Sequence, residues 1–523
     1  MDTTTASTAA PAPTVALGLA PPTPADVVAV ARHGARVELT DEARDALAEG
    51  RRRIEALAGR DRPAYGVSTG FGALADRHIP GELRTQLQRS LIRSHAAGSG
   101  DPIEREVVRA MMLLRLRTLT SGRTGVRPEV AETLAALLNA GITPLVREHG
   151  SLGCSGDLAP LAHVALVLMG EGEVLDDDGR PTPAAEALTA AGIEPVVLAE
   201  KEGLALINGT DGMLGMLLLA LEDLAALVRV ADIATAMSVE SLLGSDRVFA
   251  DELQRLRPHP GQAASAGNIR ALLAGSPIVA SHQGPDCSLV QDAYSLRCAP
   301  QVAGAVRDTA EHAALVAGRE LASIIDNPVV TEDGEVSSNG NFHGAPVGYV
   351  LDFLAVAVAD LASIAERRTD RALDAKRSHG LPHFLAHDPG VDSGLMIAQY
   401  TQAAIVSDLK RLAVPASVDS IPSSAMQEDH VSMGWSAARK LRGALDGLTR
   451  VLAIEVMTAA RALDLRAPLA PADATAAVVA ALRERVPGPG SDRYLSPELE
   501  ATVDLVRSGA LVAAAESVTG PLN

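Results

Sequence analysis

Aromatic residues are scarce in this 523-residue chain: they make up 2% of it, with a single tryptophan and five residues each of tyrosine and phenylalanine. Runs of β-branched residues are also few. Both kinds of residue favour strands, so we expect no large β-sheet. Alanine and leucine supply most of the apolar content of 47%, and both favour helix. The composition therefore predicts a mainly α protein.

Cysteine and positive charge are in short supply as well. The three cysteines, at positions 154, 287 and 298, are too few for a disulfide scaffold. They suit a reducing cytosol, and we expect a cytoplasmic protein. Lysine and arginine total 46 against 65 acidic residues, which gives a net charge of -19. Such a charge repels phosphate backbones and argues against nucleic acid as a partner.

Signals for a membrane, a nucleotide and a metal are missing too. Glu222 and Asp223 interrupt the most apolar stretch, whereas about 20 uninterrupted apolar residues are needed to cross a bilayer. No P-loop or dinucleotide-binding fingerprint occurs. Three histidines within 379–387 have the spacing of metal ligands on a helix, but a glycine and a proline among them would break that helix. We therefore expect no membrane partner, no nucleotide and no essential metal.

Helical patterns are what the chain has in abundance. Asp101 and the proline after it predict the start of a helix, and leucines at helical spacing from residue 441 onward predict a long packed one. Val329–Thr331 and Glu335–Ser337, around an Asp-Gly turn, predict a hairpin. Three further stretches are long enough and apolar enough to be long helices: 211–243, 302–325 and 347–378.

These patterns divide the chain into four consecutive segments. The predicted segments are a flexible, Thr/Ala/Pro-rich tail at 1–20, a loop-rich N-terminal catalytic domain at 21–210, a central bundle of long helices at 211–465, and a C-terminal helical end piece at 466–523.

The segment HGSLGCSGDLAPLAH, residues 149–163, contains the most informative triplet, Cys154-Ser155-Gly156. Gly153 and Gly156 allow the backbone to fold back on itself around Ser155. Attack of the Gly156 nitrogen on the Cys154 carbonyl carbon would then close a five-membered ring. Loss of one water there and of another from Ser155 would leave a methylidene-imidazolone. No ordinary side chain is an electrophile of this kind.

Two other interpretations of the triplet exist. An isolated Ser-Gly pair is usually only a turn. A serine-hydrolase elbow, G-x-S-x-G, would need glycine at position 157, where Asp157 stands, and no apolar strand precedes the serine.

The sequence around the triplet favours formation of the methylidene-imidazolone ring. SGDLAPLAH resembles the segment that carries the 4-methylidene-imidazol-5-one group in the aromatic amino-acid ammonia-lyases and aminomutases. Cys154 replaces the alanine common there, but ring closure uses only its backbone carbonyl. The resemblance extends from about residue 25 to the C-terminus. It implies a mainly α fold with an elongated central helical bundle of the fumarase/aspartase-like type.

Further motifs carry the same resemblance in the N-terminal half. Tyr65, in YGVSTGFG, corresponds to the family's favoured general base on a loop over the active site; many members have asparagine where this chain has Ser68. His95, in LQRSLIRSHAAG, corresponds to a position that faces the substrate side chain. Asn208, in LALINGTDG, would touch the prosthetic group and the substrate amine.

The resemblance also implies roles for residues later in the chain. In VQDAYSLRCAPQVAG, Gln291 would hydrogen-bond the ring region, Tyr294 would line the site and could shuttle a proton, and Arg297 would pair with the substrate carboxylate. Phe342, in SNGNFHG, would press on the prosthetic ring.

The substrate is indicated by the segment SSAMQEDHVSMG, where Gln427 and Glu428 are expected to bind it. Phenylalanine and tyrosine lyases mostly have glutamine where this chain has Glu428. A carboxylate accepts the N–H of an imidazole more strongly than an amide does. Together with His95, Glu428 therefore favours L-histidine as the substrate and indicates the branch of the family that eliminates ammonia from histidine.

The expected activity is non-oxidative elimination of ammonia from L-histidine to give trans-urocanate, as in histidine catabolism. Ser155 would supply the electrophilic carbon, with Tyr65, Tyr294 and Glu428 as the other catalytic groups. The resemblance implies a homotetramer whose active sites are shared between subunits. Alternatives are a tyrosine or phenylalanine ammonia-lyase, an aromatic amino-acid 2,3-aminomutase, and a noncatalytic helical scaffold.

Overall fold

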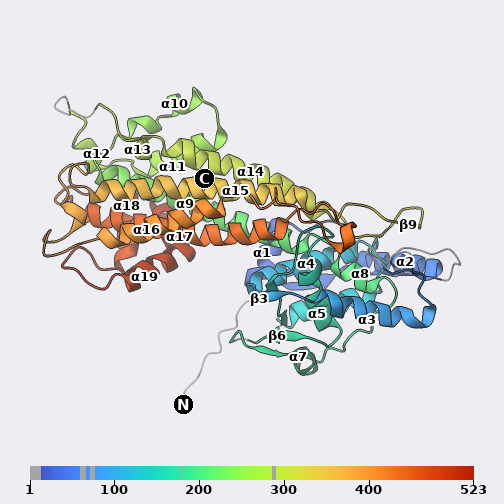
Figure 1. Cartoon of the computed structure of the whole chain (residues 1–523). Coiled ribbons are helices and arrows are strands. Elements are labelled where there is room, and N and C mark those ends of the chain that lie inside the picture. Colours follow the sequence, from blue (N-terminus) through green and yellow to red (C-terminus); the bar gives the residue numbers. More distant parts are fainter. Residues whose placement is uncertain (1–12, 59–65, 67, 71–76, 177, 285–289) are drawn as a thin grey trace, which may run out of the picture. The chain divides into compact units, whose positions relative to one another are not determined.

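The computed structural model describes residues 13–58, 66, 68–70, 77–176, 178–284 and 290–523, and helices dominate it (Figure 1). The predicted mainly α class is confirmed. The chain forms two compact units. The first comprises residues 1–219, 315–351 and 416–439, and the second comprises residues 220–314, 352–415 and 440–523. Each unit thus joins separate parts of the sequence, and the four consecutive segments remain a prediction.

The elements up to residue 207 all belong to the first unit. In chain order they are β1 (Thr14–Leu17), α1 (Pro24–His33), β2 (Arg36–Leu39), α2 (Asp41–Ala58), the 3-10 helix η2 (Gly81–Leu83), α3 (Arg84–His95), β3 (Ser99–Pro102), α4 (Arg105–Thr120), α5 (Pro128–Asn139), β4 (Thr143–Pro144), β5 (Arg147–His149), α6 (Leu158–Leu168), β6 (Glu173–Leu175), β7 (Pro181–Pro183), α7 (Ala184–Ala191) and α8 (Glu202–Ile207).

The rest of the chain contains the longest helices, and the unit boundaries fall within four of them, α9, α14, α15 and α17. The elements are α9 (Asp211–Ser241), η3 (Arg247–Phe249), α10 (Asp251–Arg255), α11 (Pro260–Leu272), α12 (Pro277–Ala280), α13 (Tyr294–Arg297), α14 (Ala299–Ala322), β8 (Val329–Val330), β9 (Val336–Ser337), α15 (Ala345–Leu373), η4 (His383–Leu385), α16 (Met396–Leu412), η5 (Ser424–Met426), α17 (Gly434–Asp464), α18 (Asp473–Arg483), α19 (Ser496–Arg507) and α20 (Ala510–Thr519).

The strands are short and form small sheets. β1 and β2 pair in parallel, whereas the pairs β3–β5, β4–β6, β6–β7 and β8–β9 are antiparallel. β8 and β9 are the predicted hairpin, with Val330 opposite Val336 and Gly334 at a φ of 83° in the turn. The four predicted long helices are present as α9, α14, α15 and α17.

The start of α4 differs from the prediction. β3 pairs with β5, and the Ile103 amide donates to the Val146 carbonyl at 2.9 Å. Strand pairing thus occupies the backbone around Asp101, and the helix begins only after Glu104. Every α4 residue from 107 to 120 is buried, which makes this helix the centre of the first unit's core. Each fully buried leucine or methionine there stabilises the fold by about 1.5–3 kcal/mol.

A buried ion pair joins three long helices in the second unit. Glu455 of α17 accepts hydrogen bonds from Arg368 Nε at 2.5 Å and Nη2 at 2.9 Å, and from Ser238 Oγ of α9 at 2.9 Å. Both charged side chains are 1% exposed. Because removing one partner would leave the other charge buried alone, the pair fixes how α9, α15 and α17 pack in this unit.

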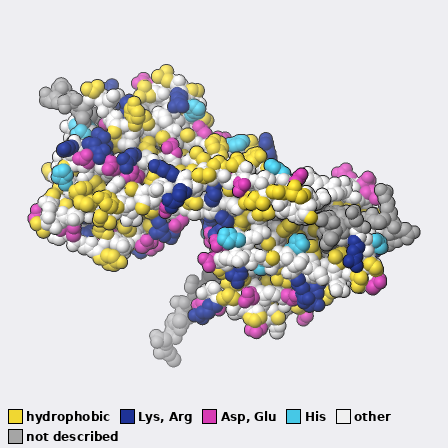
Figure 2. All heavy atoms as spheres, viewed as in Figure 1, with side chains coloured by type: hydrophobic (Ala, Val, Ile, Leu, Met, Phe, Trp, Pro, Cys, Tyr) yellow, Lys and Arg dark blue, Asp and Glu magenta, His cyan; other side chains and the backbone are white. Residues whose placement is uncertain are grey.

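Among the described helices, α15 alone is long and apolar enough to cross a membrane by length and composition. Of its most apolar 18-residue window, 61% is buried within the protein, as in a core helix. Acidic and basic side chains are interspersed over the face seen in Figure 2. Many charged side chains of the described residues pair, as Arg450 does with Glu500 at 2.8 Å.

Candidate active site

The triplet Cys154-Ser155-Gly156 lies in the loop between β5 and α6, in the first unit. Gly153 and Gly156 have φ angles of 64° and 83°, in the left-handed region that favours glycine. A Cβ on Gly156 would lie 2.2 Å from the carbonyl oxygen of Gly209. Position 156 therefore has space for glycine alone. The loop folds sharply on both sides of Ser155, as the two glycines predict.

Asp157 anchors the end of this loop. Its carboxylate accepts hydrogen bonds from the amides of Gly212 at 2.9 Å and Met213 at 3.0 Å, in the first turn of α9, and from Ser151 Oγ at 2.8 Å. Its own amide donates to the Gly209 carbonyl at 2.7 Å. Burial raises the pKa of this fully enclosed carboxyl to about 7. Sequence reasoning used Asp157 only to exclude a hydrolase and missed this role.

Segments from far along the chain hold the other side of the loop. The Gly153 carbonyl accepts Ser432 Oγ at 2.7 Å and the Gly344 amide at 3.1 Å. The amide of Met433 donates to the Leu152 carbonyl at 2.9 Å. The triplet is thus fixed by backbone contacts at both ends, which is what the predicted intramolecular ring closure requires of its reactants.

Glu428 reaches the triplet from the segment before α17. Its Oε1 accepts a hydrogen bond from Ser155 Oγ at 3.0 Å, and its Oε2 accepts bonds from Cys154 Sγ at 3.2 Å and Ser423 Oγ at 3.0 Å. Burial, followed by the charge of Glu428, raises the pKa of the Cys154 thiol to about 12. The thiol therefore stays protonated and acts as a hydrogen-bond donor, not as a nucleophile.

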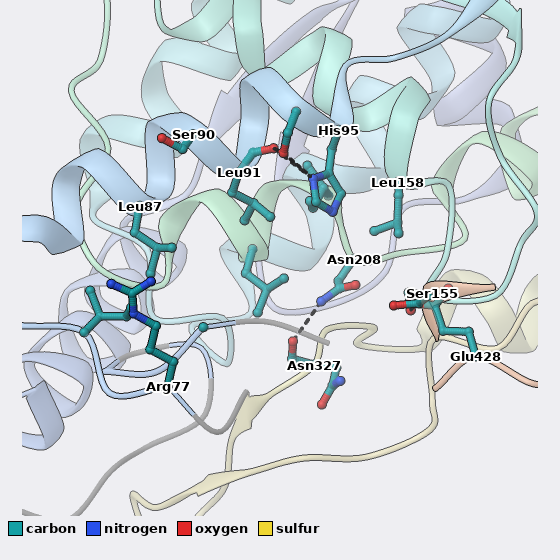
Figure 3. Close-up of a pocket in the computed structure, with 16 residues that line it drawn as sticks. Arg77, Leu87, Ser90, Leu91, His95, Ser155, Leu158, Asn208, Asn327 and Glu428 are labelled. Atoms are coloured by element: carbon teal, nitrogen blue, oxygen red, sulfur yellow. Dashed lines mark hydrogen bonds between the residues drawn. The ribbon is translucent and has the colours of Figure 1, made fainter. Parts of the chain in front are cut away.

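A cavity of about 650 Å³ opens beside these groups. His95, Ser155, Asn208 and Glu428 line it, so it brings together four of the predicted site residues (Figure 3). Arg77 lies at the opposite end of the cavity from Ser155 and Glu428. Its remaining lining is mostly apolar: Gly70, Ile79, Leu87, Ser90, Leu91, Ser94, Leu158, Leu204, Ile207, Asn327 and Ser424.

His95 is the last residue of α3 and is held by its own helix. Its Nδ1 lies 2.9 Å from the Leu91 carbonyl oxygen and 3.1 Å from Ser94 Oγ. A carbonyl can only accept, so Nδ1 carries the proton. Burial lowers the pKa of His95, and the neutral ring therefore leaves Nε2 as a hydrogen-bond acceptor.

Asn208 is held by the Asn327 backbone and by Arg115, and a buried ion pair lies next to Asn327. The Asn208 Nδ2 donates to the Asn327 carbonyl at 2.8 Å, and its own carbonyl accepts Arg115 Nη1 at 2.6 Å. Lys201 Nζ and Asp326 Oδ2 form a fully buried pair at 2.5 Å, and Asp326 also accepts the Asn327 amide at 2.8 Å. Burial lowers the pKa of Lys201 and raises that of Asp326, while their mutual attraction opposes both effects.

Of the remaining predicted residues, those that the structure describes lie outside this cavity's lining. Tyr65 lies outside the described residues. Phe342 is half-buried in the loop after β9, and Gln427 is exposed after η5. Neither lines the cavity. Their roles therefore remain predictions from the resemblance.

Gln291, Tyr294 and Arg297 belong to the second unit. Tyr294 is 72% exposed, and Arg297 Cζ lies 4.7 Å from the centre of its ring. Such a contact holds a guanidinium over an aromatic face. The Arg297 Nε is buried without a hydrogen-bond partner among the described residues. None of these three residues lines the cavity in the first unit.

Comparisons with known proteins identify the family of the chain. The model of the aromatic amino acid lyase family matches residues 23–484. A histidine ammonia-lyase of Streptomyces avermitilis is 67% identical over 510 residues, which cover 97% of this chain and 99% of that protein. The histidine ammonia-lyase of Sorangium cellulosum is 52% identical over 95% of this chain and 98% of that protein.

Solved structures are similar over nearly the whole chain. A tyrosine aminomutase from Streptomyces globisporus has a TM-score of 0.92 and 39% identity, and covers 97% of this chain and 100% of its own. A histidine ammonia-lyase from Trypanosoma cruzi has a TM-score of 0.88 and 37% identity, with 97% and 95% covered. With both the family model and these relatives matching nearly end to end, the chain belongs to the aromatic amino acid lyase family.

Proposed function

We propose that this protein is a histidine ammonia-lyase, which eliminates ammonia from L-histidine to give trans-urocanate. The observation that carries the proposal is the cavity in which a half-buried neutral His95 and the carboxylate Glu428 both line the space beside Ser155. An imidazole finds hydrogen-bond partners there, and a phenyl ring does not. Relatives at 67% and 52% identity that are named histidine ammonia-lyases support the choice of substrate.

Family membership implies a methylidene-imidazolone group, which we propose forms from Cys154-Ser155-Gly156. The loop fits it: position 156 tolerates only glycine, and hydrogen bonds restrain the backbone on both sides of Ser155. The group would be held by this loop, with Asn208 and Glu428 beside it. When formed, it supplies an electrophilic carbon that makes ammonia a better leaving group.

The chain's own residues would do the remaining work. His95 and Glu428 orient the side chain of the substrate. The apolar lining excludes water, which strengthens each polar contact. Tyr65 takes the β-proton, for which its pKa must fall from the usual value of about 10. Arg297 binds the carboxylate through its planar guanidinium.

We further propose a homotetramer in which neighbouring copies supply Arg297 and Tyr294 to this cavity. Large apolar side chains on the second unit support an interface between copies. Phe353 of α15 is 51% exposed, and Ile397 and Tyr400 of α16 are 58% and 60% exposed. Large apolar side chains with this much exposure are typical of association surfaces. A cytoplasmic location remains a prediction from the few cysteines.

Two measurements test the proposal. Purified protein is incubated separately with histidine, tyrosine and phenylalanine, and the products are identified. Urocanate from histidine is expected, whereas a β-amino acid would identify an aminomutase. Mass spectrometry of the peptide between Arg147 and Arg180 is expected to show a loss of two waters. Ser155→Ala should abolish that loss and lower turnover by several orders of magnitude while helicity persists.

A further inference from the structure

The cavity beside Ser155 offers hydrogen-bond acceptors to a ligand ring. His95 donates through Nδ1 to the Leu91 carbonyl at 2.9 Å, which leaves the lone pair of Nε2 as the only polar group that the ring can present. The alternative tautomer would set two acceptors against each other at that distance. His95 is therefore a fixed acceptor in this site.

Glu428 supplies a second acceptor, and its two oxygens are not equivalent. Oε2 is held by Cys154 Sγ at 3.2 Å and Ser423 Oγ at 3.0 Å. Among the described residues, Oε1 binds only the Ser155 hydroxyl, at 3.0 Å. Ring formation removes that hydroxyl as water, so maturation frees Oε1 while Oε2 stays fixed. A mature site thus has Oε1 open beside the cavity.

A neutral imidazole has one N–H and one acceptor nitrogen. Facing two acceptors, it can donate to only one of them, and its own acceptor nitrogen is left without a donor. A protonated imidazole has two N–H groups, one for each. We propose that this site binds the imidazole ring of its substrate as the cation, with one N–H donated to His95 Nε2 and the other to Glu428 Oε1. This inference rests on the proposed function and specifies the protonation state of its substrate.

The charges around the cavity are compatible with a bound cation. Arg77, the cationic side chain in the lining, lies at the far end from Glu428. The other charged or titratable groups on α3, and those on the helices α6 and α8 packed against it, have partners: Arg84 with Glu200, Arg89 and Arg93 with Glu171, His163 with the Gly98 amide, and Glu202 with Arg127. Glu428 is thus the charge that faces the ring.

A cationic ring would also assist the chemistry. The proton to be removed lies on the carbon attached to the ring, and it is only weakly acidic. A positive charge on the ring withdraws electrons from that carbon and makes the proton easier to remove. The two acceptors would in this way prepare the substrate for the base as well as select it.

The test uses imidazole as a probe of the subsite in the full-length, mature protein. Calorimetric titrations are run at pH 8.5 in two buffers with different ionisation enthalpies. Free imidazole is mostly neutral at this pH, about two units above the usual pKa of such a ring. We expect uptake of close to one proton per bound imidazole. Pyrazole, which has the same shape but one N–H and little basicity, should bind at least about 10-fold more weakly.

Variants separate the subsite from general effects. Glu428→Gln should abolish the proton uptake. Glu171→Gln, which changes a carboxylate paired with Arg89 and Arg93 outside the cavity lining, should leave it unchanged. Binding without proton uptake, equal affinity for pyrazole, or no imidazole binding at all would each overturn the inference. Histidine turnover is measured on the same preparation, and its absence would instead refute the proposed function.

Discussion

Gly156→Ala is the sharpest perturbation of the reactive loop. Gly156 has a φ of 83°, and an added Cβ would lie 2.2 Å from the Gly209 oxygen. Ordinary contact begins at 3.4 Å, so the backbone of Gly209 would have to move by about 1.2 Å. A left-handed residue with a Cβ costs a further 1–2 kcal/mol, roughly. Gly209 also accepts the Asp157 amide at 2.7 Å, so the movement would loosen the loop that must close the ring.

We expect the Gly156→Ala protein to keep its helices but to form little or no prosthetic group. Mass spectrometry of the peptide between Arg147 and Arg180 measures the mature fraction, and circular dichroism measures helicity. Displacement of reacting groups by about 1 Å costs on the order of 100-fold in rate. Maturation should therefore be slowed at least by that factor during expression and storage.

Gly192→Ala is the matched control. Gly192 caps α7 with a φ of 67°, and a Cβ there would meet nothing within 4 Å. It tests the strain of a left-handed alanine without the collision. This variant should mature fully. Full maturation of Gly156→Ala as well would refute the argument that space at position 156 controls ring closure.

The other predictions concern the substrate, the base and the loop anchor. Tyr65→Phe should still form the prosthetic group but lose about 10²–10⁴ in turnover; unchanged turnover would assign the proton to another group. Arg297→Lys should raise KM and lower kcat, because a point charge cannot replace a planar fork. Glu428→Gln combined with His95→Leu should lower kcat/KM for histidine relative to phenylalanine, and an unchanged ratio would remove the main support for histidine. Burial raises the folded-state pKa of Asp157 to about 7, above its unfolded value, so its ionisation opposes folding and stability falls as pH rises from about 4 to 7. Asp157→Asn should remove up to about 4 kcal/mol of that decline, seen as a flatter melting temperature between pH 4.5 and 7.5 at a fixed heating rate.

Local patterns in the sequence predicted the local structure well. Leucine spacing predicted α17, and the Asp-Gly pair predicted the turn between β8 and β9. Two glycines predicted the sharp fold around Ser155. Each of these depends on residues close together in the chain, where propensity and periodicity act.

Contacts between distant segments could not be predicted in this way. The hydrogen bond from Cys154 to Glu428 joins residues 274 positions apart. The bond from Ser423 to Glu428 depends on an isolated β-bridge between these two residues in an irregular segment. The late start of α4 follows from strand pairing with β5, which overrides a good capping sequence. In the sequence, the only indication that the first turn of α9 anchors Asp157 is that an acidic residue directly follows the triplet. Sequence alone did not say what would surround it.

The contacts of Gly153 with Gly344 and Ser432 have a consequence for biosynthesis. Ser432 lies 279 residues after Gly153. A ribosome must therefore finish most of the chain before the triplet can be compressed. If the ring forms as proposed, an unfinished or misfolded polypeptide would carry an ordinary serine and would expose no electrophile to cellular thiols and amines. The proposed modification would thus be a chemical record that folding has been completed.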